Sequence, residues 1–257
     1  MEKILLFDLD GTLLRSDKTI SGRTLEAVER SRRKGCIIGV STSRGKSNCL
    51  RYISRLSPDI IISSGGALVT YKGRTIISEE FSSEETADII SAARRICGDV
   101  DITSDASDDD AEYYRNFVPP QDELEKSWGK SIFTDFLGFS KPSLKLCFEI
   151  EDEEKASKLK SMLPWCDCIR FSDGCWYKFT KSGVTKENAI LKLCAHIGAA
   201  PEDITAFGDD LADIGMLKMC CRGVAMGNAL PEVKAAANIV IGSNDEDGIA
   251  GYLEDNF

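Results

Sequence analysis

The feature that most constrains the fold is a regular alternation of short, continuously apolar runs with helical stretches in the first quarter of the chain. The apolar runs lie at 3–8, 36–41 and 59–63, and the helical stretches lie at 21–35 and 46–56. Runs that are apolar on both faces are typical of strands in a parallel sheet covered by helices. This segment therefore predicts a βαβαβ unit with right-handed crossovers, whose ligands bind at the carboxyl ends of its strands.

The alternation returns near the C-terminus, but the middle of the chain follows a different order. The C-terminal part is expected to form a helix at 186–198 and strands at 204–208, 222–226 and 238–242. The middle is expected to form helices at 84–96 and 152–163, strands at 100–104, 144–150, 168–172 and 175–179, and a helical or irregular stretch near 121–136. We therefore predict an α/β protein with a doubly wound parallel-sheet core, residues 1–82 and 182–257, and an inserted α+β domain, residues 83–181.

Charge and hydropathy exclude several classes of function. The chain of 257 residues has a formal net charge of −10, so nucleic acid is not an expected partner. No apolar run approaches the roughly 20 residues that a membrane span requires. Asp8 ends the first apolar run too early for the core of a signal peptide, and the ten cysteines lack Cys-x-x-Cys spacing, so we expect a cytoplasmic protein with reduced thiols. The expected assembly is a monomer or a small homo-oligomer.

One group of cysteines and one group of acidic residues could suggest metal sites, but neither has the pattern of one. Cys166, Cys168 and Cys175 do not have the usual spacing of zinc ligands. The densest acidic cluster lacks the glycine and the terminal glutamate of a calcium loop, so it is predicted to be a solvated loop. Its members are Asp105, Asp108, Asp109, Asp110 and Glu112.

The strongest chemical signal is a pair of carboxylates at the end of the first predicted strand. Asp8 lies at the carboxyl end of this strand, and a turn at Gly11 would let Asp8 and Asp10 face one point while the amides of the loop, including that of Thr12, surround an anion. Two carboxylates in this position need a cation or a shared proton. An Asp-Gly turn explains Asp10 and Gly11 without any site, but it does not explain Asp8.

Further polar residues and a glycine turn follow the remaining predicted strands, and these strand ends are expected to converge on the same edge of the sheet. They are Thr42, Ser43 and Arg44 after the second strand, Gly65 in the turn after the third, and Asp209, Asp210 and Asp213 after a C-terminal strand. Thr42 has a local alternative as a helix cap, and the three aspartates have one as acids near a helix N-terminus. Together they suit a site for Mg²⁺ and phosphate.

Lys186 stands where a cation is unfavourable, in the first turn of a predicted helix. A bound phosphate would remove this conflict, because helix N-termini attract anions. The alternative is a solvent-exposed lysine that costs a few tenths of a kcal/mol.

In this order the segments resemble the four motifs of the haloacid dehalogenase-type phosphatases. The segments are Asp8-Leu9-Asp10-Gly11-Thr12-Leu13, Ser41-Thr42-Ser43-Arg44, Lys186 and Gly208-Asp209-Asp210-Leu211-Ala212-Asp213. The turn Ser64-Gly65-Gly66-Ala67 and the segments 183–186, 223–229 and 245–249 resemble the Cof-like branch of that family. Members of this branch carry a class IIB α+β cap between the second and third motifs, where the inserted domain lies. The resemblance covers the whole chain, through specific motifs in the core and a match of length and pattern in the cap.

The chain departs from the Cof-like pattern at three positions. Ser43 stands where the family usually has glycine, and Gly65 and Ala212 stand where it usually has asparagine. The two missing side-chain amides bear on substrate range and turnover. Every charged group of the family mechanism is present.

The resemblance implies a role for each residue. Asp8 is the nucleophile that forms an aspartyl-phosphate, Asp10 is the general acid and base, and Thr42 and Lys186 bind the phosphoryl group. The remaining phosphate contacts would come from Gly11, Thr12, Ser43, Arg44 and Gly65. Magnesium would be held by Asp8, the Asp10 carbonyl, Asp209 and Asp213, the last of these through a bound water while it orients Lys186. In the cap, candidates for substrate contact are Tyr113, Tyr114, Arg115, Trp176 and Lys178.

The expected function is therefore Mg²⁺-dependent hydrolysis of a small phosphate ester, such as a sugar phosphate or a related cofactor. Two alternatives stay open. One is a sugar phosphomutase of the same superfamily, and the other is a ligand-binding or regulatory protein in which Gly65 and Ala212 mark weakened catalysis. A glycosyltransferase that uses only Asp8 and Asp10 would leave Thr42, Lys186 and Asp213 unexplained.

Overall fold

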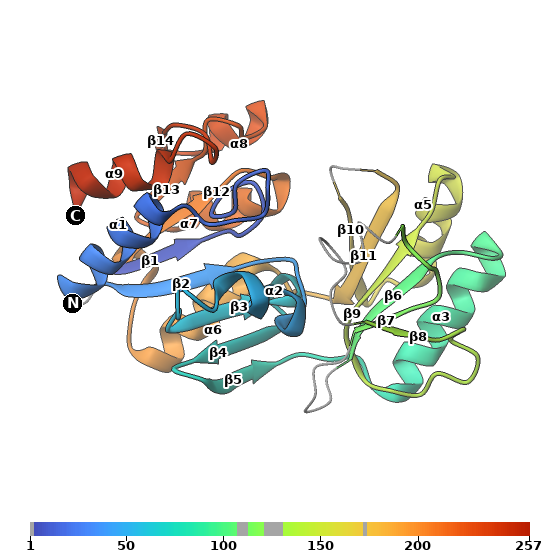
Figure 1. The fold of residues 1–257 in the computed structure, drawn as a ribbon. Coiled ribbons are helices and arrows are strands. Elements are labelled where there is room, and N and C mark those ends of the chain that lie inside the picture. Colours follow the sequence, from blue (N-terminus) through green and yellow to red (C-terminus); the bar gives the residue numbers. More distant parts are fainter. Residues whose placement is uncertain (1–2, 107–112, 121–130, 172–173) are drawn as a thin grey trace. The chain divides into compact units, whose positions relative to one another are not determined.

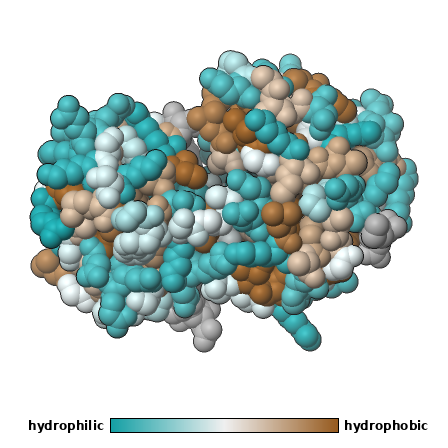
Figure 2. All heavy atoms as spheres, turned by 180° about the vertical axis from the view of Figure 1, so that it is seen from behind, coloured by the Kyte–Doolittle hydropathy of each residue, from teal (hydrophilic) through white to brown (hydrophobic). Residues whose placement is uncertain are grey.

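The computed structural model describes residues 3–106, 113–120, 131–171 and 174–257, and it divides into two compact units (Figure 1). The core unit comprises Met1–Ser43, Cys49–Ile77 and Thr185–Phe257. The inserted unit comprises Arg44–Asn48 and Ser78–Val184. The sequence predicts the ends of the inserted domain at residues 83 and 181. Among the described residues, no helix is long and apolar enough to cross a membrane, and hydrophilic side chains spread over most of the face shown in Figure 2.

The core unit is built on an eight-stranded sheet with the order β14-β13-β12-β1-β2-β3-β4-β5. Six strands pair in parallel, which confirms the predicted doubly wound core. They are β1 (Ile4–Phe7), β2 (Ile37–Ser41), β3 (Ile60–Ser63), β12 (Ile204–Gly208), β13 (Arg222–Ala225) and β14 (Ile239–Val240). All six are short, and the five from β13 to β3 are mostly buried, as strands covered on both faces must be, whereas the edge strand β14 is partly exposed.

Two strands at one edge of this sheet were not predicted. β4 (Leu68–Tyr71) runs antiparallel to β3, and β5 (Arg74–Ser78) follows it after a turn of two residues. Both turn residues have positive φ, 47° at Lys72 and 76° at Gly73. This is the backbone that a tight hairpin between twisted strands requires. The parallel core therefore ends in an antiparallel hairpin.

The helices of the core unit pack in pairs. α1 (Gly22–Arg33) contacts α9 (Gly248–Asn256), and α6 (Lys186–Ile197) contacts α7 (Ile214–Met219). Ser21 caps the N-terminus of α1, because its side chain accepts a hydrogen bond of 3.0 Å from the backbone N–H of Thr24. The core unit also contains α8 (Pro231–Ala236) and the larger part of α2 (Lys46–Ile53).

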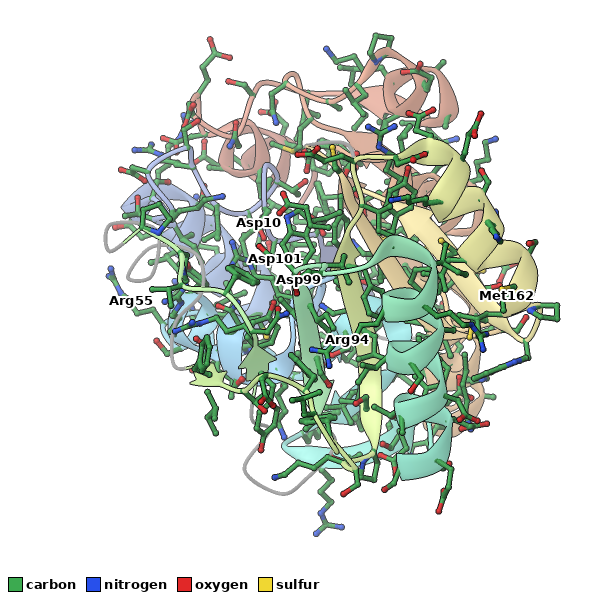
Figure 3. The ribbon with its side chains drawn as sticks, turned by 90° about the vertical axis from the view of Figure 1, so that its right-hand side faces the viewer. Asp10, Arg55, Arg94, Asp99, Asp101 and Met162 are labelled. Carbon is green, nitrogen blue, oxygen red and sulfur yellow. The ribbon has the colours of Figure 1, made fainter. Side chains whose placement is uncertain are left out.

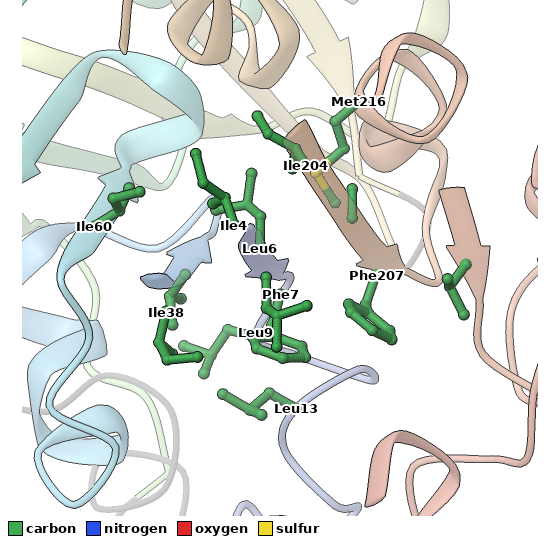
Figure 4. Close-up of a cluster of buried hydrophobic side chains, with 14 of the residues drawn as sticks. Ile4, Leu6, Phe7, Leu9, Leu13, Ile38, Ile60, Ile204, Phe207 and Met216 are labelled. Atoms are coloured by element: carbon green, nitrogen blue, oxygen red, sulfur yellow. The ribbon is translucent and has the colours of Figure 1, made fainter. Parts of the chain in front are cut away.

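The hydrophobic core of this unit is centred on β1 and its two neighbours (Figure 4). Phe7 on β1 stacks against Phe207 on β12 with ring centroids 4.7 Å apart, and both side chains are fully buried. Ile38 on β2 and Met216 on α7 belong to the same cluster. This packing holds the carboxyl ends of β1 and β12 side by side.

The inserted unit has its own sheet of six strands, in the order β10-β11-β9-β6-β7-β8. The strands are β6 (Ile102–Ala106), β7 (Tyr113–Arg115), β8 (Ser131–Phe133), β9 (Ser143–Glu149), β10 (Cys166–Arg170) and β11 (Trp176–Lys181). The helices are α3 (Ser83–Cys97) and α5 (Glu153–Met162), near their predicted positions. β8 lies within the stretch 121–136 that was expected to be helical or irregular, and residues 121–130 of that stretch lie outside the described part of the chain.

One face of the inserted sheet packs against α3 and α5 and forms a second hydrophobic cluster with them. The other face of the sheet is polar. Tyr114 belongs to the hydrophobic cluster, where its ring lies 5.1 Å from that of Phe139. This packing assigns Tyr114 to the unit's own core. The neighbouring residues Tyr113 and Arg115 pair with Asp105 and Thr103 on the polar face.

Asp105 corrects one prediction. It was assigned to a solvated acidic loop, but it lies on β6, is 4% exposed and forms an ion pair of 3.2 Å with Lys145 on β9. A carboxylate is tolerated in such a place when a paired cation accompanies it. The other members of the acidic cluster, residues 108–110 and 112, lie outside the described part of the chain.

Candidate active site

The site begins at the carboxyl ends of β1 and β12, which the sheet register sets next to each other. Phe7 is paired with Phe207, and the backbone N–H of Asp8 donates a hydrogen bond of 2.9 Å to the Phe207 carbonyl. Asp8 directly follows β1, and Asp209 directly follows β12. Parallel strands end at the same edge of a sheet, so the two carboxylates come together, as the sequence predicts.

Lys186 joins the two halves of the site. It is the first residue of α6 and is only 4% exposed. Its Nζ donates hydrogen bonds of 2.6 Å to Asp8 Oδ1 and 2.6 Å to Asp213 Oδ1. The alternative of a solvent-exposed lysine is therefore wrong. A cation in the first turn of a helix is explained here by two carboxylates within contact distance.

Asp213 is fully buried, and both of its oxygens are occupied by hydrogen bonds. Oδ1 accepts from Lys186, and Oδ2 accepts from the backbone N–H groups of Asp209 and Asp210 at 3.0 and 3.1 Å. It thereby ties the ammonium group to the loop that carries Asp209. Asp210 caps the following 3₁₀ turn, Leu211–Asp213, by accepting from the Leu211 N–H at 2.7 Å.

Asp209 is held from the side of the β1 loop. Thr12 Oγ1 donates a hydrogen bond of 2.5 Å to Asp209 Oδ1. The side chain of a residue predicted to contact phosphate thus positions a carboxylate. Gly11 approaches the same carboxylate, and a Cβ atom at this position would lie 2.2 Å from Asp209 Oδ2. Gly11 also has φ of 77°, which L side chains rarely adopt. Any larger residue here would displace the carboxylate.

Burial dominates the protonation equilibria of the site. It raises the pKa of Asp8 well above its usual range, even though Lys186 acts in the opposite direction. Burial likewise raises the pKa of Asp209 to about 7, against the hydrogen bond from Thr12. The pKa of Lys186 is raised too, because the attraction of Asp213 and Asp8 outweighs the effect of burial. The ammonium group of Lys186 thus opposes the negative charge of this cluster of carboxylates.

The same three carboxylates suit a divalent cation. Asp8, Asp209 and Asp213 each offer an oxygen, and these atoms lie within 4.8 Å of one another. Hard cations such as Mg²⁺ prefer carboxylate and carbonyl oxygens. A dication would balance the excess negative charge of this cluster. The donor set therefore fits a magnesium ion.

Asp10 lies on the loop after β1 (Figure 3). Its side chain is bound by a lysine that is not among the predicted site residues. Lys18 Nζ donates a hydrogen bond of 2.9 Å to Asp10 Oδ1, and both side chains are 36% exposed. The carboxylate of Asp10 is thus outside the set formed by Asp8, Asp209 and Asp213. A role of Asp10 in metal binding would use its backbone carbonyl.

Thr42 and Gly65 lie together at the ends of β2 and β3. Thr42 is buried, its N–H donates to the Ile62 carbonyl at 2.8 Å, and its carbonyl accepts from the Gly65 N–H at 3.1 Å. Gly65 has φ of 71° and ψ of 21°, a left-handed conformation that glycine and asparagine both tolerate. The backbone thus accommodates the replacement of the usual asparagine. Ser43 follows at the end of this core segment, and Arg44 groups with the inserted unit.

Two asparagines to which the sequence assigned no role also bind the loop after β1. Asn228 Nδ2 donates a hydrogen bond of 2.7 Å to the Gly11 carbonyl, and Asn244 N–H donates to Asn228 Oδ1 at 3.1 Å. Asn244 Nδ2 also donates to the Leu14 carbonyl at 2.8 Å. Asn228 lies in a segment that resembles a Cof-like motif and Asn244 directly precedes another, but sequence alone does not say that they contact the β1 loop.

The geometry suits attack of a carboxylate on an anionic electrophile. Asp8 supplies an oxygen nucleophile, and Lys186 holds positive charge directly beside it. Positive charge placed where negative charge accumulates lowers the barrier for phosphoryl transfer.

A model of the haloacid dehalogenase-like hydrolases matches residues 5–253. The chain is 28% identical to a putative phosphatase of Haemophilus influenzae, over 100% of this chain and 99% of the relative. It is 27% identical to the 5-amino-6-(5-phospho-D-ribitylamino)uracil phosphatase YitU of Bacillus subtilis, over 99% of this chain and 97% of that protein. A solved sugar phosphatase of haloacid dehalogenase subclass IIB is 27% identical, with a TM-score of 0.82 over 98% of both chains.

Proposed function

This chain is a Cof-like phosphatase of the haloacid dehalogenase-like hydrolase family, and on that premise we propose that it hydrolyses a small phosphorylated metabolite through an aspartyl-phosphate on Asp8. The observation that carries the proposal is the buried contact of Lys186 Nζ with both Asp8 and Asp213, at 2.6 Å each. A carboxylate at a strand end with a buried lysine beside it is suited to accept a phosphoryl group, because the lysine can bind the phosphoryl oxygens.

In the first step, an Asp8 carboxylate oxygen attacks phosphorus as the bond to the leaving oxygen breaks. The electron pair of the breaking bond goes to the leaving oxygen, which takes a proton from the Asp10 carboxyl group. The products are an alcohol and phosphorylated Asp8. Lys186 and the Thr42 hydroxyl bind the phosphoryl oxygens during this transfer.

In the second step, water attacks the phosphorus of the aspartyl-phosphate. Asp10, now a carboxylate, takes a proton from this water. The bond between phosphorus and the Asp8 oxygen breaks, and its electron pair restores the Asp8 carboxylate. Inorganic phosphate leaves, and both carboxyl groups have returned to their starting states.

Magnesium is part of the proposal. Asp8, Asp209 and the Asp10 carbonyl would hold the ion, and Asp213 would orient Lys186 beside it. The ion supplies neutralising charge that lets an anionic ester approach an anionic nucleophile. The close set of Asp8, Asp209 and Asp213 oxygens, together with the pKa of Asp209 raised to about 7, supports a need for such charge.

The proposed substrates are sugar phosphates or related phosphorylated cofactors in the cytoplasm. Two relatives support this class, one acting on a phosphoribitylaminouracil and one described as a sugar phosphatase. The inserted unit would select among leaving groups as a cap. Its candidates for this contact are Tyr113, Arg115, Trp176 and Lys178, of which Tyr113, Arg115 and Lys178 are largely buried.

The proposal is tested by measuring Mg²⁺-dependent phosphate release from a panel of sugar phosphates, nucleotides and phosphorylated cofactors. We expect selective release by the wild type and none by Asp8→Asn, because an amide cannot form the phosphoenzyme. Asp255→Asn, an exposed carboxylate on α9, is the matched control and should keep wild-type rates. Wild-type rates in Asp8→Asn would contradict the mechanism, and an isomerised sugar phosphate without free phosphate would indicate a mutase.

A further inference from the structure

The loop formed by Arg15–Thr19 presents a lysine to the proposed acid and base. Lys18 Nζ lies 2.9 Å from Asp10 Oδ1, and this contact falls within the core unit. The proposed mechanism above gives Lys18 no task.

The backbone of Lys18 is strained in a way that a surface lysine does not require. Its φ is 64°, in the left-handed region that costs a non-glycine residue on the order of 1 kcal/mol or more. A tight turn imposes this conformation, because Lys18 N–H donates to the Arg15 carbonyl and Arg15 N–H donates to the Thr19 carbonyl, both at 2.9 Å. Glycine or asparagine would fit the turn with less strain.

The turn is also fixed from the other end of the chain. Asp245 accepts hydrogen bonds from the N–H and hydroxyl of Ser16, at 2.9 and 2.6 Å. Arg15 forms an ion pair of 2.6 Å with Asp247. These contacts hold the turn in one place relative to the β1 loop. The side chain of Lys18 therefore starts from a defined position.

We propose that Lys18 is a positioning residue that holds the Asp10 carboxyl group in place for proton transfer to the leaving oxygen. Lys18 binds Oδ1 of the carboxyl group that gives the proton to the leaving group and later takes one from water. Lys18 itself neither gains nor loses a proton and does not touch the substrate. The inference rests on the proposed function, because it assigns Asp10 the role of acid and base.

This role of Lys18 predicts that its loss affects esters with poor leaving groups more than esters with good ones. An ester with a poor leaving group, such as an alkyl phosphate, needs a proton from Asp10, whereas 4-nitrophenyl phosphate releases a stable phenolate without one. Loss of positioning therefore lowers kcat/KM for alkyl esters and spares the aryl ester. A displaced acid costs up to about 10²-fold in rate.

The experiment compares Lys18→Met and Lys18→Asn with the wild type on one alkyl phosphate and on 4-nitrophenyl phosphate. Asparagine tolerates the left-handed backbone, so it removes the ammonium group with the turn retained. For both variants we expect kcat/KM for the alkyl ester to fall at least about tenfold and kcat/KM for the aryl ester to stay within about threefold. Lys234→Met on α8, also a partly exposed lysine, should change neither value.

A double-mutant cycle decides whether Lys18 acts through Asp10. In an Asp10→Asn background, Lys18→Met should lower kcat/KM for the alkyl ester no further. Equal losses on both esters, an additive loss in the Asp10→Asn background, or no loss at all would overturn the inference. If the wild type hydrolyses neither ester nor any member of the substrate panel, the proposed function itself has failed.

Discussion

At the scale of single residues, the site concentrates negative charge in a buried place and opposes it with one lysine. Asp8 and Asp213 share the ammonium group of Lys186, and Asp209 receives a hydroxyl hydrogen bond from Thr12. Desolvation penalises the charged form of each buried carboxyl group. The site therefore has an excess of negative charge that a bound cation can neutralise.

The raised pKa of Asp209 makes stability depend on pH in the metal-free protein. Asp209 ionises near 3.8 when the chain is unfolded and near 7 when it is folded, so between these values the folded protein holds an extra proton. Raising the pH from 5 to 8 should therefore lower the free energy of unfolding. Thermal unfolding in EDTA should give a lower Tm at pH 8 than at pH 5.

Magnesium should oppose this loss, because it binds ionised carboxylates. We expect Mg²⁺ to raise Tm more at pH 8 than at pH 5. Asp209→Asn should weaken both the pH dependence and the response to Mg²⁺. A Tm in EDTA that does not fall between pH 5 and pH 8 would refute the assignment.

At the scale of elements, two loops from distant parts of the chain cooperate to shape the β1 loop. Asn228 follows β13 and Asn244 follows β14, and together they bind the carbonyls of Gly11 and Leu14. The side chain of Asn228 spans a separation of 217 residues in sequence to do so. The backbone of the Asp10 loop is thereby fixed by C-terminal strands that carry no catalytic group.

Asn228→Ala should lower kcat/KM by about tenfold, because small displacements of a catalytic loop are costly in rate. The loss of stability should stay near 1 kcal/mol, since the hydrogen bond is exposed. Asn238→Ala is the matched control, because Asn238 Oδ1 also binds a backbone group, the N–H of Gly223 at 2.7 Å. Kinetics and urea unfolding of both variants check the prediction, and an equal rate loss in both would contradict it.

At the scale of the whole molecule, the chain builds two separate hydrophobic clusters. One surrounds Phe7 and Phe207 in the core unit, and the other contains Phe148 and Phe179 in the inserted unit. Phe148 and Phe179 meet edge to face with ring centroids 5.5 Å apart. Each unit therefore has a core of its own, as an independently stabilised domain requires.

Phe179→Ala should destabilise the inserted unit selectively. Removing a buried phenylalanine costs about 3–5 kcal/mol, and this loss falls on the cluster that contains it. Hydrogen exchange followed by mass spectrometry should show faster exchange in β9 and β11, with β1 and β12 unchanged. Phe207→Ala should give the reverse pattern. Equal acceleration in both units would show that they unfold as one.

Much of the fold follows from local patterns in the sequence. Apolar runs located β1, β2, β3 and β12 because a strand buried on both faces needs such residues over its whole length. The hairpin of β4 and β5 was missed, since Lys72 is unusual in a turn that requires positive φ. The short strands β7 and β8 carry too few residues for a period to be recognised.

The site divides in the same way. Asp8 and Lys186 were selected from their positions at a strand end and a helix start, which are local properties. The contacts of Lys18 with Asp10, of Asn228 with Gly11 and of Lys145 with Asp105 were not, and the buried pairing of Asp105 contradicted a prediction from composition. Spacing in a sequence reports which face of an element a residue occupies. Partners, burial and pKa values depend on which distant elements pack together, and only the tertiary structure decides that.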